Sequence, residues 1–246
     1  MRISRGFLEV GMAEYREELK FIAPQHKLDI IHGRLKTVMS YDRHQIGESY
    51  RIRSLYFDDY YDSALHENDA GVDNRYKIRV RVYEDPSATM NLEIKYKFKG
   101  RTRKEGCPLT REQYDDILAG NLVFDPEHPK PLQVVYLKSR MSYLKPKLIV
   151  EYERTAFAHP LGNVRITFDR NVSYSDRIED FFQDRIDLVP LMEKNTHILE
   201  VKYDEFLPDY IAQLLETGGM ARTAFSKYYL SRMSAKGETL YGGKID

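Results

Sequence analysis

The sequence predicts an α+β protein built around one large antiparallel β-sheet. Two observations lead to this prediction. Segments in which apolar and charged residues alternate with a period of two outnumber the segments with helical periodicity. The two clearest strands, residues 74–83 and 91–99, are joined by a short turn around Pro86, as in a hairpin. Hairpin connections make antiparallel pairs, so the strands belong to an antiparallel sheet with helices packed on it.

Eight strands and five helices follow in chain order. The strands are expected around residues 16–20, then at 51–58, 74–83, 91–99, 102–109, 148–157, 163–170 and 197–203. Helices are expected at residues 25–39, after Pro24, at 111–118, capped by Thr110, and at 131–144, 208–216 and 226–233. Residues 125–131 read as a loop between helices and residues 217–219 as a helix end. Asp58 and Asp59 close a strand and are expected to cap a following helix.

Length and composition indicate a folded domain that spans residues 1–246, with no internal repeat. Hydrophobic residues make up 42% of the chain, which excludes a disordered chain. No run of 18 apolar residues occurs, so we expect no transmembrane segment and a cytoplasmic location. The single cysteine, Cys107, excludes an internal disulfide and argues against a structural zinc site.

Positive charge is concentrated on one face of the hairpin. Lys and Arg number 38, as do Asp and Glu, yet residues 75–104 carry ten cations against three anions. Because side chains on a strand alternate between faces, the cations of residues 75–81 share one face and the apolar residues between them share the other. A solvated face usually mixes signs, since like charges opposite each other are destabilising. We therefore expect a closed antiparallel barrel, with helices packed outside and the cations lining a cavity that binds phosphate chains.

Other ligand classes fit the sequence less well. The phosphate-binding glycine motifs of P-loop and dinucleotide-binding folds are absent, so side chains would have to hold any triphosphate. The seven histidines show no metal-ligand spacing. A nucleic-acid partner is not expected, because Tyr76, Tyr96 and Phe98 fall on the face opposite the cations, whereas a stacking platform needs both together. For Lys97, Lys99, Arg101 and Arg103, nearer the rim of the hairpin, a cavity role and a solvated role are both open.

An ordered set of motifs resembles the VTC domain, the polyphosphate polymerase branch of the triphosphate tunnel metalloenzymes, or CYTH-like proteins, in its stand-alone bacterial form. The motifs are Arg16-x-Glu18-x-Lys20-Phe21, residues 54–58, Arg75-x-Lys77-x-Arg79-x-Arg81-x-Tyr83, Glu93-Ile94-Lys95, Lys104, and residues 151–157, 164–169, 199–202 and 225–228. The resemblance implies a tunnel of eight antiparallel strands. In that family, the terminal phosphate of ATP is transferred to a growing polyphosphate chain with the help of a divalent metal, Mn²⁺ or Mg²⁺.

The resemblance also implies roles for individual residues. Catalysis would fall to Arg79, Arg81, Lys95 and Glu200, and Glu200 would bind the metal, whereas Glu18 is better explained as an ion-pair partner. The phosphate-binding set would be Lys20, Arg79, Arg81, Lys95, Lys104, Arg154, Arg165, Lys202 and Lys227.

Two alternatives to the polymerase stay open. One is a triphosphatase that acts on tripolyphosphate or a nucleoside triphosphate, and the other is a binding module for polyphosphate or nucleotides without turnover. The partners expected are ATP and polyphosphate or tripolyphosphate, and a membrane protein is a further possible partner. The sequence leaves the oligomeric state open.

Overall fold

The computed structural model describes residues 15–43, 45, 47–84 and 89–238. The strands are β1 (Glu17–Pro24), β2 (Ser40–Tyr41), β3 (Tyr50–Asp58), β4 (Arg75–Tyr83), β5 (Met90–Phe98), β6 (Arg101–Leu109), β7 (Lys145–His159), β8 (Val164–Ser175), β9 (Val189–Pro190), β10 (Thr196–Tyr203) and β11 (Ala221–Arg222). The helices are α1 (Gln25–Leu35), α2 (Ser63–Asp69), α3 (Arg111–Ala119), α4 (Lys130–Ser142), α5 (Asp209–Leu215) and α6 (Lys227–Ala235), with short 3₁₀ turns η1 (Leu161–Asn163) and η2 (Ile178–Phe182).

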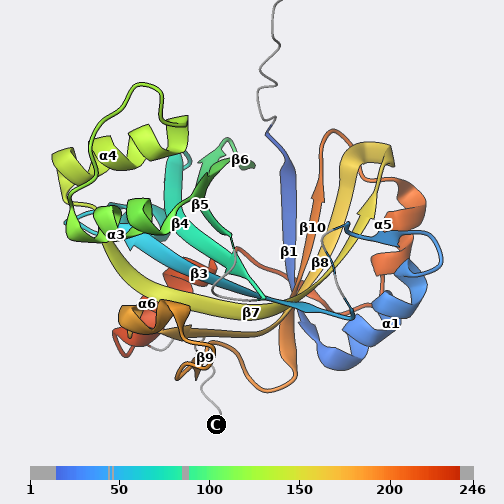
Figure 1. Ribbon diagram of the computed structural model, residues 1–246. Helices are drawn as coiled ribbons and strands as arrows, with labels where there is room; N and C mark the ends of the chain where they lie inside the picture. Colours follow the sequence, from blue (N-terminus) through green and yellow to red (C-terminus); the bar gives the residue numbers. More distant parts are fainter. Residues whose placement is uncertain (1–14, 44, 46, 85–88, 239–246) are drawn as a thin grey trace, which may run out of the picture.

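These strands form one antiparallel sheet of 11 strands. Its order is β11-β1-β10-β8-β7-β3-β4-β5-β6, with β2 beside β7 and β9 beside β8. The sheet bends into a deep trough: β4, β5 and β6 form one limb, β8, β10 and β1 form the other, and β7 and β3 lie between them (Figure 1). The predicted α+β class with a large antiparallel sheet is confirmed.

The predicted closure of the sheet into an eight-stranded barrel is wrong. Its two limbs meet, within the described part of the chain, at a single bridge before β1, where Arg16 and Thr102 exchange backbone hydrogen bonds of 2.9 and 3.0 Å. The register of this bridge would next bring Glu18 opposite Gly100. Gly100 lies in the turn between β5 and β6 with a φ of 77°, and Lys99 before it has a φ of 48°. The chain reverses there, so the ladder cannot continue from this bridge along β1.

Helices cover the convex face of both limbs (Figure 1). α4 contacts β5, β6 and α3. On the other limb, α1 contacts β1, β10 and α5. The apolar residues of the alternating strands face these helices: Ile78, Val80, Leu92 and Ile94 are almost fully buried in one cluster with Leu132 of α4. Burial of apolar surface stabilises the fold by about 25 cal/mol per Å². This gain fixes the orientation of β4 and β5 and leaves their charged residues on the concave face.

Most predicted elements are present, with shifted ends. α1 stops at Leu35 rather than at residue 39, because the chain turns back to pair β2 with β7. Thr110 caps α3 as expected, and its hydroxyl accepts the N–H of Gln113 at 3.1 Å. The turn at Pro86 lies outside the described residues. No helix in the described ranges has the length and apolar character needed to cross a bilayer.

Helix α2 was not predicted, although its capping residues were. Asp58 accepts the backbone N–H of Ala64 at 2.9 Å and that of Leu65 at 3.1 Å. Asp59 accepts the N–H of Ser63 at 2.9 Å. The two carboxylates therefore satisfy the free N–H groups at the start of α2, which confirms the predicted capping role.

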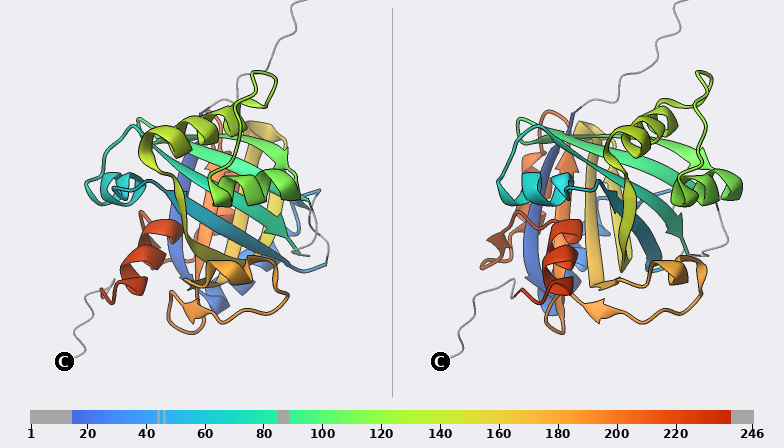
Figure 2. Two further views of the ribbon diagram at one scale, coloured as in Figure 1. Left: turned by 60° about the vertical axis from the view of Figure 1, so that its left-hand side comes forward. Right: turned by 90° about the vertical axis from the view of Figure 1, so that its left-hand side faces the viewer.

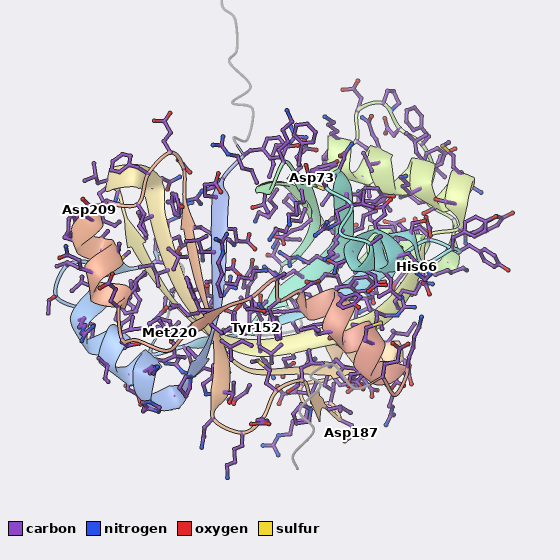
Figure 3. All side chains as sticks on the ribbon, turned by 180° about the vertical axis from the view of Figure 1, so that it is seen from behind. His66, Asp73, Tyr152, Asp187, Asp209 and Met220 are labelled. Atoms are coloured by element: carbon purple, nitrogen blue, oxygen red, sulfur yellow. The ribbon has the colours of Figure 1, made fainter. Side chains whose placement is uncertain are left out.

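The segment from β11 to α6 crosses the back of the trough. β11 pairs with β1, and the chain then continues to α6, which contacts α2, β7 and β8. Both views of Figure 2 show α2 and α6 side by side. Seen from behind, the segment that follows Met220 passes near Tyr152 on its way to α6 (Figure 3). Residues 223–228 are thereby placed against the concave face of the sheet.

Candidate phosphate-binding cavity

The concave side of the trough encloses a cavity of about 630 Å³. Strands from both limbs line it, together with residues 223–228 between β11 and α6. Tyr152, one of the lining residues, lies near the middle of the molecule (Figure 3). Pockets that hold small ligands typically measure about 300–1,000 Å³, so the cavity has the size of a ligand site.

All nine cations of the predicted phosphate-binding set line this cavity. They come from eight different elements: Lys20 of β1, Arg79 and Arg81 of β4, Lys95 of β5, Lys104 of β6, Arg154 of β7, Arg165 of β8, Lys202 of β10 and Lys227 of α6. Further cations that the predicted set did not include also line it: Arg16, Arg75, Lys77, Lys97 and Arg103. The alternation along β4 had already placed Arg75 and Lys77 on the face expected to line the cavity. Of the four rim cations whose role was left open, Lys97 and Arg103 line the cavity, whereas Lys99 and Arg101 are not among its lining residues.

Glu93 of β5 forms ion pairs with three of the cations. Its carboxylate oxygens lie 2.7 Å from Arg79 Nη2, 2.8 Å from Lys104 Nζ and 3.6 Å from Arg81 Nη1. Burial alone would raise the pKa of Glu93, but the charges of Arg79, Arg81 and Lys104 hold it well below its ordinary value. Sequence reasoning missed this role, although Glu93 stands directly opposite Arg79 in the β4–β5 ladder. Glu93 therefore holds the two guanidinium groups in place.

Tyrosine hydroxyls complete the support of these guanidinium groups. Arg79 Nη1 donates to the hydroxyl of Tyr56 at 3.0 Å, and Arg81 Nη2 donates to that of Tyr152 at 3.1 Å. Burial would raise the pKa of Tyr56, but Arg79 and Arg81 lower it overall. Tyr76 packs on the outer cluster as predicted, yet it also borders the cavity. The expectation that Tyr76, Tyr96 and Phe98 lie apart from the cations is therefore wrong for Tyr76, whereas Tyr96 and Phe98 are not among the residues that line the cavity.

Asp169 of β8 anchors a second pair of cations. It is fully buried and accepts two hydrogen bonds from Arg154, at 2.6 and 2.7 Å, and one from Lys227 at 2.5 Å. Burial would raise the pKa of Asp169, but Arg154 and Lys227 lower it to about 2. Sequence reasoning did not assign Asp169, although it shares a strand face with Arg165. Its ion pair with Lys227 brings the first residue of α6 to the cavity.

Glu18 and Glu200 are buried carboxylates that line the cavity itself. On the paired strands β1 and β10, Glu18 stands opposite Lys202 and Glu200 opposite Lys20. Glu18 lies 3.0 Å from Lys20 and 2.6 Å from Lys95, and Glu200 pairs with Lys202. Burial would raise the pKa of Glu18, but the three lysines hold it well below its ordinary value. The pKa of Glu200 is lowered as well, by Lys202 and Lys20 against burial and the charge of Glu18.

These two carboxylates fit a hard divalent cation, which takes oxygen ligands. Within the described ranges, no group of three or more His, Cys, Asp and Glu side chains could hold a metal ion. Mg²⁺ or Mn²⁺ would thus take Glu200 or Glu18 from the protein and its other ligands from phosphate oxygens and water. Thr167, opposite Glu200 on β8, has a buried Oγ1 with no hydrogen-bond partner among the described residues, but it is not one of the residues that line the cavity. The donor set therefore suits a metal that arrives with a phosphate ligand.

Lys77 and Lys95 carry charge in the cavity that the protein does not fully compensate. Burial, together with Lys20 and Lys202, lowers the pKa of Lys95 to about 7, although Glu18 opposes the change. Burial and the neighbouring cations hold the pKa of Lys77 well below its ordinary value. Charged lysines are destabilised in such surroundings, and a bound anion would relieve that cost. The geometry and the charge both favour a phosphate-rich ligand.

The model of the VTC domain family matches residues 15–236. No curated protein matches the sequence significantly.

Among solved structures, the chain is similar in fold to a Hippeastrum protein provisionally assigned as an adenylyl cyclase and described as having a dominant triphosphatase activity. The two share 15% identity with a TM-score of 0.54, and the match covers 92% of this chain and 97% of that one. A Pyrococcus horikoshii protein is 16% identical with a TM-score of 0.47, over 89% of this chain and 96% of that one.

Proposed function

This chain belongs to the VTC domain family, and we propose that it is a polyphosphate polymerase that transfers the terminal phosphate of ATP to a growing polyphosphate chain. The observation that carries the proposal is the cavity, in which nine cations from eight elements surround two buried carboxylates. Arginine and lysine bind phosphate oxygens through charge-assisted hydrogen bonds, which are stronger inside a protein than in water. A cavity of this composition is suited to a chain of phosphates.

The reaction needs little covalent chemistry from the protein. A terminal oxygen of the acceptor chain forms a bond to the γ-phosphorus of ATP, and the bond to the β–γ bridging oxygen breaks, which releases ADP. Positioning and charge stabilisation account for most of the catalysis in such transfers. Arg79 and Arg81, held by Glu93, would contact the oxygens of the transferred phosphate, and Lys95 would balance the charge on the leaving group.

Glu200 would hold the divalent metal, with Glu18 as the second carboxylate beside it. When bound, the metal supplies neutralisation of phosphate charge next to the transferred group. Lys202 pairs with Glu200 in the free protein. Once Glu200 is engaged, the Lys202 ammonium would be free to contact phosphate oxygens, together with Lys20 on the neighbouring strand.

A triphosphatase is the second candidate, and one observation favours it. Phe225 and Tyr228 are buried against Tyr56 and Tyr152 where α6 crosses the back of the trough. Tyr228 stacks on Tyr56 with ring centroids 5.2 Å apart. Residues 225–228 therefore cover part of the cavity on this side, which would leave less room for a growing chain. In this alternative, water takes the place of the acceptor chain.

The test is to incubate the purified protein with ATP and Mn²⁺, separate the products on a polyphosphate-stained gel and assay free phosphate in parallel. The polymerase predicts a ladder of long chains that is absent with Glu200→Gln. Free phosphate without chains would replace the polymerase by the triphosphatase. Neither product, despite tight triphosphate binding, would identify a non-catalytic binding module.

A further inference from the structure

Ion pairing divides the cations of the cavity into two groups. Each cation of the predicted phosphate-binding set lies within an ion-pair distance of Glu18, Glu93, Asp42, Asp169 or Glu200. Arg16 and Arg103 are paired too, with Asp204 and Glu105. Among the described residues, no carboxylate forms such a pair with the remaining cavity cations, which are Arg75, Lys77 and Lys97.

These three cations are neighbours on β4 and β5. Arg75 stands directly opposite Lys97 in the ladder, and Lys77 stands opposite Lys95. Like charges in opposite positions repel each other, so this arrangement is unfavourable in the free protein. Lys77 donates to two neutral acceptors, Asn68 Oδ1 and Ser226 Oγ, both at 2.7 Å.

Asp73, the acidic group that acts most strongly on Arg75 and Lys97, makes its hydrogen bonds elsewhere. The charge of Asp73 acts on both Arg75 and Lys97, but its oxygens accept the backbone N–H of Lys99 at 2.7 Å and that of Gly100 at 2.9 Å. Asp73 therefore holds the turn between β5 and β6 rather than pairing with a cation. Burial lowers the pKa of Lys97, and the charges of Arg75 and Lys20 lower it further.

The row of cations on β4 is longer than a triphosphate. Arg75 and Arg81 are six residues apart on one strand, which corresponds to about 20 Å at the rise of a β-strand. The inner part of the row, Arg79 and Arg81, is anchored by Glu93. The outer part ends beside Gly100, which is exposed and also lines the cavity. The row thus leads from the paired cations to solvent.

We propose that Arg75, Lys77 and Lys97 form a second anion subsite, which binds the phosphates of a chain that extends beyond a triphosphate held at Arg79 and Arg81. The inference rests on the proposed function, because it takes the first subsite to hold the terminal phosphates. It goes beyond that function in assigning a path: the chain reaches solvent past the β5–β6 turn.

The experiment compares the affinities of two probes, tripolyphosphate and a long-chain polyphosphate of defined length, measured by calorimetry with a chelator and no metal. The variant is Arg75→Gln/Lys77→Gln/Lys97→Gln. The matched control, Lys36→Gln/Arg140→Gln/Lys145→Gln, removes three exposed cations that do not line the cavity. Melting curves check that each variant folds, and single Lys77→Gln and Lys97→Gln variants serve if the triple variant does not.

We expect the ratio of long-chain to tripolyphosphate affinity to fall at least tenfold in the variant and to stay constant in the control. The long-chain affinity should also depend less steeply on salt, because fewer phosphates are neutralised. Equal loss for both probes, or no loss, would overturn the subsite. If the wild type binds the long chain more tightly but makes no chains from ATP, the subsite stands and only the polymerase fails. If it binds neither probe, both proposals fail.

Discussion

Lys95 of β5 and Glu18 of β1 form an ion pair across the open seam of the sheet, with Lys95 Nζ 2.6 Å from Glu18 Oε2. Side chains thus join the two limbs where the backbone ladder stops. We predict that Glu18→Gln lowers the free energy of unfolding at pH 7 by about 3–5 kcal/mol, because it leaves buried cations unpaired, and that urea unfolding will show this loss. A second substitution, Lys95→Met, made in the Glu18→Gln variant should restore part of the lost free energy of unfolding.

The matched control for this prediction is Glu17→Gln. Glu17 pairs with Arg101 at the same seam, but both side chains are far more exposed to solvent than Glu18. Exposed pairs contribute about 0–1 kcal/mol, so the control should cost little. Equal costs for the two variants would contradict a structural role for Glu18 at the seam.

Arg79→Ala and Arg81→Ala should each weaken tripolyphosphate binding. A hydrogen bond to a charged group contributes about 1.5–3 kcal/mol, which corresponds to roughly a tenfold to hundredfold rise in Kd. Calorimetry would measure the change, with Arg140→Ala as a control for the loss of an exposed arginine. Unchanged binding in both variants would remove the assignment of this cavity to phosphate.

Local alternation was enough to predict which charged residues of β4 and β5 face inward. The apolar residues between the cations pack under α3 and α4, as their period of two required. Closure of the sheet was a different matter, since it depends on where two distant edges meet. The bridge between Arg16 and Thr102 and the tight turn at Gly100 together set the seam, and no local pattern encodes their relative position.

The residues of the site also differ in whether local sequence patterns predict them. Its cations could be identified because each lies in a recognisable strand or helix motif. Among the carboxylates that anchor them, Glu18 was correctly predicted as an ion-pair partner. Asp169 was not predicted, because it meets Arg154 only through the pairing of β7 with β8, and meets Lys227 only where α6 returns to the sheet. Tyr56 of β3 and Tyr152 of β7 were not predicted to face the cavity, because their strands lack the marked basic alternation of β4.

Glu200→Gln should abolish metal-dependent turnover while the fold is kept. The amide is nearly isosteric but loses the charge that a divalent cation requires. Product formation from ATP would be followed as a function of Mn²⁺ concentration, and tripolyphosphate binding with a chelator present would serve as the control readout. We expect activity to be lost and metal-free binding to persist. Full activity at ordinary Mn²⁺ concentrations would move the metal site away from Glu200.

Asp62 should make stability depend on acid pH, because it fastens α6 to the sheet. Its carboxylate lies 2.8 Å from Lys147 of β7 and 2.6 Å from Arg232 of α6. Burial would raise the pKa of Asp62, but hydrogen bonds from Arg232 and Lys147 lower it from 3.8 to about 2. The unfolded chain therefore binds more protons between these two values, and the stabilisation present above pH 4 is lost as the pH falls toward 2.

We therefore expect Asp62→Asn to be less stable than the wild type at pH 7 and to lose less stability on acidification. Urea unfolding at a series of pH values down to about 2 would measure both effects, a range that spans the folded and unfolded pKa values of such a pair. Asp115→Asn, which breaks an exposed pair with Arg111, is the control. Because Lys227 begins α6, the Asp62 variant should also bind tripolyphosphate more weakly at neutral pH. Parallel pH profiles for the wild type and Asp62→Asn would show that this anchor contributes nothing to acid stability.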